Sequence, residues 1–392
     1  MKILFVSLFL PQEKAYHAGG RYVFELIRRL SQRHEIHLAT RLEDREIPSL
    51  ELLRPFCKEI HPYTYASIEK RNLFDLFKLV FNYLGFSRYA DRLVRDGNFD
   101  LVQVEWVETA IMIKRRKTPM VLDAHDVITK PVERAMKAGA GFGKAKGYLK
   151  YLLIRYFETH IIRKFSPVFT RSEYDKAYIL SMKPDLDVKV IPHPAGLDIT
   201  DRSMPREKNS ILFFASYKYR RLNVDAALYF YREVFPLIRK AVPDARFIIA
   251  GYGPPEELTS IPSKDPGVTV TGFVDDMDEL YKRASVFVAP ILVGGGIIVK
   301  ILDAMASGTP VVTTSYGNEG IGAKPGTDLL IADDPQTFAG CVLKFLADRE
   351  YADKTAGCGR SFVKRNFGVD VVMEKIEKSY ESLLKRHLRS NA

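Results

Sequence analysis

The sequence is poor in cysteine and tryptophan, and it lacks a long hydrophobic run. Of its 392 residues, three are cysteine and one is tryptophan. Cys57, Cys341 and Cys358 are far apart and form no CxxC pair, which argues against a zinc site or a disulfide framework and favours free thiols in a reducing cytosol. No uninterrupted apolar segment reaches the ~18 residues that a transmembrane helix needs. With 46% hydrophobic and 27% charged residues, the composition is that of a globular chain of two or three domains.

The sequence opens on a short apolar segment, MKILFVSLFLPQ. It has the basic start and apolar stretch of a signal peptide, but it lacks a cleavage site of small residues. The apolar run is typical of a buried first β-strand, which is the structure we expect.

Positive charge is in excess and is concentrated in one segment. The net charge is +11, and residues 114–164 hold 13 basic and 4 acidic residues. Such a cluster favours contact with a polyanion or an anionic membrane surface, and a solvated basic face is the alternative. The glycine-rich stretch 138–147 predicts a flexible segment. Residues 146–165 predict a basic amphipathic helix, suited to a membrane surface or to packing on a sheet, whereas residues 72–94 predict a core or interdomain helix.

Short apolar runs alternate with helix-like segments in both halves of the chain. This alternation predicts βαβ units, parallel sheets and an α/β fold of two doubly wound domains. A polar stretch with three prolines, IPHPAGLDITDRSMPREKNS, marks the boundary. We therefore expect domains at 1–200 and 201–370, followed by an amphipathic helix over 371–392 that returns to the first domain.

Three consecutive glycines form the strongest local motif. Gly294, Gly295 and Gly296 stand between an apolar strand and a helix. Their unobstructed N–H groups and the positive end of the helix dipole favour a phosphate or diphosphate. Lys300 follows about one turn into the helix, and Asp303 lies on the same helix face, where it could accept hydrogen bonds from a ribose. The alternative is a tight turn followed by a Lys–Asp surface pair.

A second pair of glycines, Gly19 and Gly20, opens the first helix and exposes N–H groups in the same way. Neither cluster has the GxGxxG pattern after a first strand, which disfavours a dinucleotide-dependent dehydrogenase. The P-loop pattern of GK followed by Ser or Thr is also absent.

Several segments together carry a resemblance to one enzyme family. They are AGGRYVFELIRRLSQRHEIHLAT, VLDAHDV, VFTRSEYD, VIPHPAGLD, SILFFASYKYRRLNVDAALYFYREVFPLIRKAVPDARFIIAGYGP, VTVTGFVDDM and GGGIIVKILDAMASGTPVVTT. The chain resembles retaining glycosyltransferases of family four, bacterial group 1 type, which have the GT-B fold. The resemblance implies two Rossmann-like domains facing an interdomain cleft. It also implies a hexosyl-type transferase that moves a sugar from a nucleotide-diphosphate sugar to a glycan or lipid-linked acceptor, in bacterial cell-surface polysaccharide biosynthesis.

The resemblance places the sugar donor mainly in the second domain, with the diphosphate at the three glycines, the ribose at Asp303 and the nucleobase at Phe273 and Val274. The expected donor-binding residues are Gly19, Gly20, Ser216, Lys218, Arg220, Phe273, Val274, Gly294, Gly295, Gly296, Ile297 and Asp303. Two positions depart from the family pattern. Gly295 stands where a sugar-contacting Glu is usual, and Ser216 stands where an Arg is usual.

The expected catalytic residues are His125, Asp126, Arg221 and Lys300. Arg221 stands where the family has a Lys and would neutralise the leaving diphosphate, a role for which Lys218 and Arg220 compete. His125 and Asp126 follow an apolar strand, at an edge where parallel sheets bind ligands. The resemblance puts His125 beside a sugar hydroxyl; a His-Asp cap of the next segment is the alternative. Retention in this family is attributed to front-face attack with the leaving phosphate as base, so no protein nucleophile is required.

No metal or other cofactor is expected, because helix dipoles and basic side chains can neutralise the diphosphate. The expected partners are the nucleotide-sugar, the acceptor and an anionic membrane that contacts the basic first domain; no nucleic acid is expected. The protein would be cytoplasmic or peripheral on the inner face of the plasma membrane. Two other functions stay open: a GT-B relative such as a sugar-nucleotide epimerase, and a non-catalytic two-domain sugar-binding protein.

Overall fold

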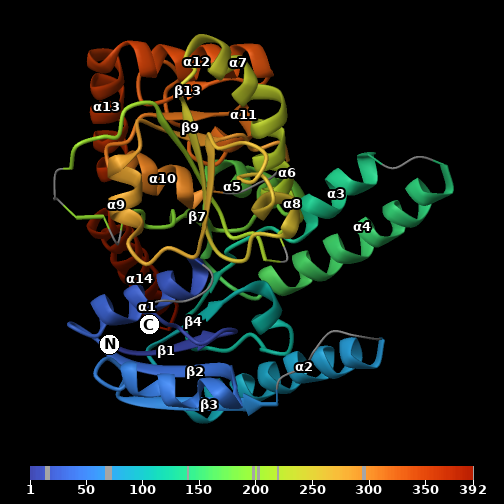
Figure 1. Cartoon of the computed structure of the whole chain (residues 1–392). Coiled ribbons are helices and arrows are strands. Elements are labelled where there is room, and N and C mark those ends of the chain that lie inside the picture. The colour runs from blue at the N-terminus through green and yellow to red at the C-terminus, as the bar shows by residue number, and fades with distance from the viewer. Residues whose placement is uncertain are drawn as a thin grey trace. The chain divides into compact units, whose positions relative to one another are not determined.

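The structure is a computed structural model, shown in Figure 1, and it describes residues 1–391 except 14–17, 67–72, 139–140, 197–198, 201–203, 219 and 294–296. The chain divides into two compact units. The first contains residues 1–191 and 373–392, and the second contains residues 192–372. The division after Ile191 lies at the start of the proline-containing segment that was expected to mark the boundary, and before the expected division at residue 200.

The first unit is built on a seven-stranded parallel sheet with the order β3-β2-β1-β4-β5-β6-β7. Its strands are β1 (Lys2–Ser7), β2 (Glu35–Glu43), β3 (Glu59–Tyr65), β4 (Leu101–Glu105), β5 (Met120–Asp123), β6 (Val168–Thr170) and β7 (Val188–Val190). Its helices are α1 (Ala18–Leu30), α2 (Leu73–Asp96), α3 (Thr129–Ala138), α4 (Gly141–Ile162) and α5 (Glu173–Met182), with short 3-10 turns η1 (Asp44–Leu52) and η2 (Val107–Ala110). The opening apolar segment is a buried strand inside the sheet, as predicted.

Two strands of this sheet were not predicted. β3 lies at the sheet edge, where its side chains alternate between half-buried and exposed and include His61 and Pro62. β7 has only three residues. Neither strand has the continuous apolar run that identifies a strand buried on both faces.

Helices α3 and α4 form a hairpin that extends away from the sheet (Figure 1). The prediction of a flexible segment at 138–147 is wrong for most of its length, because α4 begins at Gly141. Packing against α3 outweighs the low helix propensity of glycine; a Cβ at Gly147 would lie 3.5 Å from Met136. Glu158 ties the pair together, since its carboxylate accepts hydrogen bonds from the N–H groups of Ile128 (2.8 Å) and Thr129 (2.9 Å).

Helix α2 is a core helix in its second half only. Phe86, Ala90 and Val94 are buried, whereas Phe77 and Phe81 in the first half are exposed. The expectation of a core or interdomain helix is thus met for half of its length. Among the helices of the described residues, none combines the length and the apolar composition that crossing a membrane requires.

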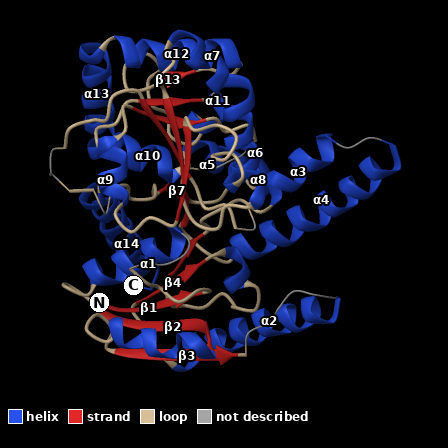
Figure 2. Cartoon of the chain, in the orientation of Figure 1, coloured by secondary structure: helices blue, strands red, loops and turns tan. Residues whose placement is uncertain are grey.

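The second unit has a six-stranded parallel sheet with the order β10-β9-β8-β11-β12-β13. Figure 2 draws the strands of the chain in red and the helices in blue. Its strands are β8 (Ser210–Phe214), β9 (Arg246–Ala250), β10 (Val268–Gly272), β11 (Val286–Ala289), β12 (Val311–Thr313) and β13 (Leu330–Ile331). Its helices are α6 (Arg221–Tyr229), η3 (Phe230–Val234), α7 (Phe235–Ala241), α8 (Glu256–Thr259), α9 (Met277–Arg283), α10 (Val299–Ala306), α11 (Ser315–Asn318), α12 (Pro335–Ala347) and α13 (Arg349–Phe367). Both units are doubly wound parallel α/β structures, which confirms the predicted fold class.

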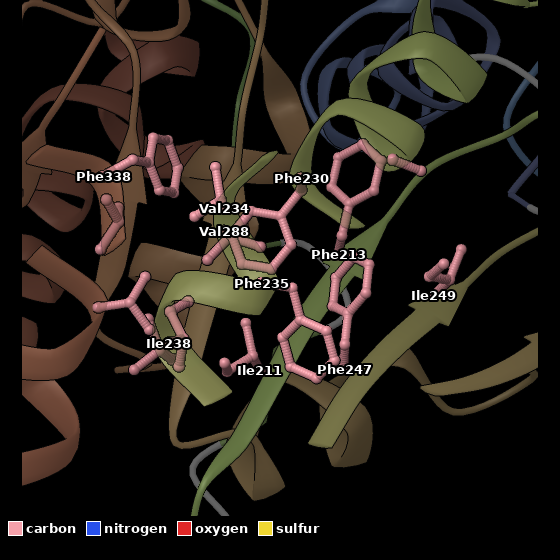
Figure 3. Packing of buried hydrophobic residues seen from close by; sticks show 14 of the residues in the cluster. Ile211, Phe213, Phe230, Val234, Phe235, Ile238, Phe247, Ile249, Val288 and Phe338 are labelled. Atoms are coloured by element: carbon pink, nitrogen blue, oxygen red, sulfur yellow. The ribbon is translucent and has the colours of Figure 1, made fainter. Parts of the chain in front are cut away.

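A cluster of phenylalanines fills one face of the second sheet, as Figure 3 shows. Phe230 lies 4.7 Å from Phe247 and 5.8 Å from Phe338 between ring centroids. The segment η3, which carries Phe230, is one turn of π-helix. Pro236 has no N–H to continue the α-helical pattern, and the N–H of Phe235 bonds to the carbonyl of Phe230, five residues back. With this wider turn, Phe230 and Phe235 are both buried in the core.

The last helix, α14 (Val369–Asn391), starts in the second unit and belongs to the first from Met373 onward, as expected for the returning tail. Ile376 and Tyr380 are fully buried. The hydroxyl of Tyr380 donates to the side-chain amide oxygen of Gln103 on β4. Arg386 Nη2 donates to Asp187 at 2.7 Å.

Candidate functional site

The second sheet reverses its strand order between β8 and β11. In doubly wound sheets, ligands bind at the carboxyl ends of the strands beside such a reversal. Gly294, Gly295 and Gly296, predicted to hold the diphosphate, follow β11 but lie outside the described residues. The described side chains of this region come from the loops after β8, β9 and β10 and from the first turn of α10.

Lys300, in the first turn of α10, is directed toward the loop after β8. Its Nζ donates to Asn223 Oδ1 (3.1 Å) and lies 4.9 Å from the ring centroid of Phe213. Asn223 Nδ2 donates in turn to the carbonyl oxygen of Ser216 (2.7 Å). Burial, and next the positive charge of Arg220, lower the pKa of Lys300 to about 7. The side chains that contact Lys300, those of Asn223 and Phe213, are neutral, and the nearby Arg220 is cationic. This group of side chains therefore favours an anionic ligand.

Arg221 does not join this group. It donates to Asp225 (2.8 Å) and to both carboxylate oxygens of Glu257 (2.9 Å each). Because two carboxylates on α6 and α8 already neutralise its charge, the structure does not support the leaving-group role expected of Arg221. Arg220, whose charge acts on Lys300, is the better-placed basic residue.

Two exposed aromatic side chains follow β9 and β10. Tyr252 and Phe273 meet edge to face, with 6.5 Å between ring centroids, and Phe273 is 69% exposed. Lys218 Nζ donates to the hydroxyl of Tyr252 (3.3 Å). Exposed aromatic rings can stack on a nucleobase. Val274 instead packs against the core, which leaves Phe273 as the stronger of the two predicted base contacts. Tyr252 was not predicted, although GYG directly after an apolar strand was a usable signal.

Backbone hydrogen bonds hold these loops together. The N–H of Ala215 donates to Ala250 (3.0 Å), and the N–H of Tyr217 donates to Tyr252 (2.9 Å). Gly251 has a φ of +129°, and a Cβ there would overlap the carbonyl oxygen of Ala215. Only glycine permits this approach, so Gly251 sets the position of Tyr252.

The predicted ribose ligand, Asp303, already has a contact within the second unit. Its Oδ1 accepts a hydrogen bond from the N–H of Gly196 (3.0 Å), where φ is +70°. Asp303 therefore holds the segment around Gly196 against α10, whatever it contributes to a ligand. Ile297, predicted beside the diphosphate, is half-buried and packs against the same core as Val274.

In the first unit, a buried polar cluster forms at the ends of β4, β5 and β6. Arg171 Nη2 lies 2.7 Å from Asp123 Oδ1 and 3.1 Å from His125 Nδ1. Asp123 Oδ2 accepts from the hydroxyl of Tyr22 (3.1 Å), and His125 Nε2 lies 2.7 Å from Glu105 Oε2. Burial raises the pKa of Glu105 and of Asp123.

This cluster determines the tautomer of His125. A guanidinium can only donate, so Nδ1 accepts from Arg171 and Nε2 carries the proton that is donated to Glu105. Both ring nitrogens thus bond within the protein. This speaks for a structural role of His125 and against the expected contact of its ring with a sugar hydroxyl. Asp126, the next residue, is exposed.

The backbone is strained at two of these strand ends. Trp106, directly after β4, has a φ of +67°, and His125 has a φ of +57°, both unfavourable for bulky residues. Their rings stack with 4.1 Å between centroids and 8° between planes. Phe9, beyond the end of β1, meets Trp106 edge to face at 5.0 Å. The strand order reverses between β1 and β4, so this strained group marks a candidate binding region.

Glu105, Asp123 and His125 also have the spacing of metal ligands. Arg171 contacts two of the three and supplies the positive charge that a cation would bring. The residues therefore fit a salt-bridged cluster rather than a metal site.

Sequence reasoning missed Glu105, Trp106 and Arg171. Each ends or directly follows an apolar strand, which is the signal that pointed to His125. The other predicted pair, Gly19 and Gly20, lies in the first turn of α1, as expected, and residues 14–17 before it are outside the described part of the chain.

Comparisons with known proteins give the family of the chain and the solved structures whose fold is similar. Residues 19–198 match the family described as Glycosyltransferase Family 4, and residues 208–348 match the family described as Glycosyl transferases group 1. The chain belongs to these glycosyltransferases. Its GT-B fold resembles sucrose-phosphate synthase from Thermosynechococcus elongatus, with a TM-score of 0.75 and 16% identity over 98% of this chain and 100% of that one. It also resembles Anabaena HepE in complex with UDP and glucose, with a TM-score of 0.67 and 15% identity over 97% and 100% of the two chains.

Two relatives of this glycosyltransferase are more similar in sequence over shorter stretches. An uncharacterized 44.6 kDa protein in the cps region of Klebsiella pneumoniae is 27% identical over 242 residues, which are 57% of this chain and 61% of that protein. The phosphatidyl-myo-inositol mannosyltransferase of Mycobacterium leprae is 25% identical over 184 residues, which are 46% and 48% of the two chains. The matches thus span about half to three-fifths of these relatives.

The buried cluster predicts a pH-dependent effect of removing Arg171. In Arg171→Met, Glu105 and Asp123 lose their positive partner, and we expect the first unit to lose ~3–5 kcal/mol of stability at pH 8. A carboxyl group whose pKa is raised in the folded state stabilises the fold when protonated, and this stability is lost as the pH rises through that pKa. The loss should therefore be smaller at pH 5, as measured by denaturant unfolding at both pH values.

The control is Arg116→Met, which removes a more exposed ion pair with Asp91 (2.8 Å) in the same unit. We expect it to cost ~0–1 kcal/mol. Equal losses for Arg171→Met at pH 5 and pH 8 would contradict the role assigned to the buried carboxyl groups.

Proposed function

We propose that the protein transfers a sugar from a nucleotide-diphosphate sugar to a glycan or lipid-linked acceptor, with retention of anomeric configuration, in the synthesis of a bacterial cell-surface polysaccharide. The observation that carries this proposal is the anion-favouring group of Lys300, Asn223 and Arg220 at the carboxyl ends of the strands beside the reversal of strand order, in a chain of this family. The HepE complex with UDP and glucose supports a nucleotide-sugar donor, and the Klebsiella relative from a cps region supports the polysaccharide setting.

In this proposal the second unit binds the donor. The diphosphate lies at the glycine segment and Lys300, the ribose near Asp303, and the nucleobase against Phe273 and Tyr252. Lys300 and Arg220 stabilise the negative charge that develops on the leaving diphosphate, so that no metal ion is needed. The acceptor hydroxyl attacks from the face on which the phosphate leaves, and that phosphate takes the proton.

The first unit would bind the acceptor. Phe9 and Trp106 offer aromatic surface beside the reversal of the strand order, and Asp126 offers an exposed carboxylate at the end of β5. The buried cluster around Arg171 would hold Trp106 and His125 in their strained conformations, as a positioning element rather than a reacting group.

The test is incubation of the purified chain with UDP-, GDP- and dTDP-linked hexoses, with and without EDTA. We expect slow release of the diphosphate nucleotide from one donor class without acceptor, unaffected by EDTA, and retention in the product by NMR once an acceptor is found. Conversion of the donor sugar without nucleotide release would indicate an epimerase. Binding of free sugar without any nucleotide affinity would indicate a sugar-binding protein, and either result would overturn the proposal.

The low pKa of Lys300 predicts how donor affinity changes with pH. Burial lowers the pKa of Lys300 to about 7, and a bound diphosphate favours its charged form. Affinity for the nucleotide-sugar should therefore be constant below pH 7 and fall above it, by up to about tenfold per pH unit. A nucleotide-sugar is the right ligand for calorimetry, because its diphosphate keeps its charge across this range.

Two variants serve as controls for this prediction. Lys300→Met should bind weakly and without the pH dependence, whereas Lys300→Arg should bind without the pH dependence because arginine stays charged. A decrease above pH 7 that persists in Lys300→Met would assign the titration to another group.

The proposal includes peripheral contact with an anionic membrane, and α4 offers the surface. Six large apolar side chains form a stripe on its exposed face: Tyr148, Leu149, Leu152, Leu153, Tyr156 and Phe157. Lys146 and Lys150 flank the stripe and are exposed. The only acidic residue of α4, Glu158, is buried against α3. Exposed aromatic and aliphatic side chains bordered by lysine and free of acids suit an anionic bilayer surface.

The exposed face of α4 offers apolar side chains to the membrane more than the expected basic ones. The segment was expected to act through its basic side chains, but Arg155 is turned toward the hydroxyl of Tyr151 (2.8 Å), and the centre of the face is apolar. Association of two copies through this face would bring their lysines together without carboxylates to pair them, which disfavours a dimer as its occupant.

Liposome co-sedimentation tests this contact. We expect binding to vesicles that contain anionic lipid, weakened by salt and by Lys146→Glu with Lys150→Glu, and reduced more than tenfold in Leu149→Gln with Phe157→Gln. The matched control is Leu222→Gln, an exposed apolar residue of the second unit, which should bind like the wild type. Equal binding by all variants, or by neutral vesicles, would count against α4 as the contact.

A further inference from the structure

A separate group of side chains lies near the start of β2 and β3, at the opposite ends of the strands from the buried cluster. The parallel register places His37 of β2 beside Glu59 of β3, and His61 follows two residues later on the same face. His37 Nδ1 is 3.5 Å and His61 Nε2 is 3.6 Å from the same carboxylate oxygen of Glu59. The three atoms lie within 4.8 Å of one another.

The orientation of His37 is set from its other side. Its Nε2 lies 2.9 Å from Glu35 Oε1. Nε2 therefore carries the proton, because an ionised carboxylate can only accept. The lone pair of His37 consequently resides on Nδ1, the atom that faces Glu59.

Two buried ring nitrogens are left without a hydrogen bond in this arrangement. Among the groups that the structure describes, none makes a hydrogen bond to His37 Nδ1 or His61 Nε2. His37 is only 4% exposed. A buried nitrogen lone pair directed at a carboxylate is unfavourable unless a cation lies between them. His37 Nδ1, His61 Nε2 and the Glu59 carboxylate oxygen thus lie close together, as the ligand atoms of one cation would.

A proton on His37 would resolve this repulsion only in part. It would serve Nδ1 and Glu59, but it would leave His61 Nε2 unsatisfied. Two basic side chains, Lys2 and Lys58, act on Glu35, and Lys2 also acts on His61. One divalent cation would serve all three donor atoms.

We propose that His37, Glu59 and His61 bind a divalent transition metal ion of the zinc type. Two imidazoles and a carboxylate are usual zinc ligands, at ~2.0–2.2 Å from the metal, and ligands of a tetrahedral ion are then ~3.4 Å apart. The separations of 3.5 and 3.6 Å are close to this value. Glu35 is the outer carboxylate that orients a ligating histidine. The exposed side of Glu59 leaves a fourth position to water.

The site is structural rather than catalytic. β3 is the edge strand of the first sheet and is only partly buried, so a metal shared with β2 ties it to the sheet. Metal binding to the folded form alone stabilises it by mass action. The inference does not depend on sugar transfer, and nucleotide affinity should be the same with and without the metal.

The experiment titrates Zn²⁺ into untagged, full-length protein that was stripped with EDTA and kept reduced. We expect one Zn²⁺ per chain by calorimetry and a higher unfolding temperature of the loaded protein. Glu59→Gln and His61→Gln should each weaken Zn²⁺ binding at least tenfold, and Glu35→Gln should weaken it less. Both ligand variants are at the partly exposed edge, and circular dichroism checks their fold.

The matched control is Cys57→Ser. Cys57 is close in sequence and is the alternative zinc ligand, but burial raises the pKa of its thiol to about 12. Cys57→Ser should keep the wild-type affinity. The proposal is overturned if the wild type binds no stoichiometric Zn²⁺, if Glu59→Gln and His61→Gln bind as the wild type does, or if Cys57→Ser abolishes binding.

Discussion

Each sheet of this protein is entirely parallel, and the rest of the structure depends on that constraint. Helices cover both faces of a parallel sheet, so its strands must be apolar along most of their length. Polar side chains therefore gather mainly toward the ends of the strands. The two candidate ligand regions accordingly lie at carboxyl ends, beside the reversals of strand order, and the proposed metal site lies at the amino ends of two edge-side strands.

Polar groups at a strand end still have to be neutralised when they are buried, and the two units do this differently. In the first unit, Arg171 lies between Asp123 and His125, and its positive charge balances the buried carboxylate of Asp123. In the second unit, the partners of the Lys300 ammonium among the described residues are Asn223 and the ring of Phe213, and burial lowers its pKa. A cluster whose charges are balanced internally suits a positioning element, whereas a lysine with no carboxylate partner among the described residues suits a region that receives an anion.

The parts that local sequence determines were predictable. Strands β1, β8 and β11 were found because a strand buried on both faces reads as an apolar run, and the edge strand β3 was missed because it does not. Lys300 was found because it lies about one turn into the helix that follows a glycine segment. Asn223 and Arg171 were missed because their partners are 77 and 46 residues away in the sequence. Arg221 was preferred over Arg220 because sequence alone does not show that Glu257 pairs with it.

The same reasoning explains why His125 could be located but not given a role from sequence. A histidine after an apolar strand lies at the ligand-binding edge, whatever its ring does. Its chemistry depends on which nitrogen carries the proton, and that is decided by Arg171 and Glu105 from two other strands. Since both nitrogens are engaged and the backbone is strained, the contribution of His125 to a ligand would come through Trp106, whose ring it supports. At this edge of the sheet, the side chain offered to a ligand would then be Trp106, which stacks on His125, rather than His125 itself.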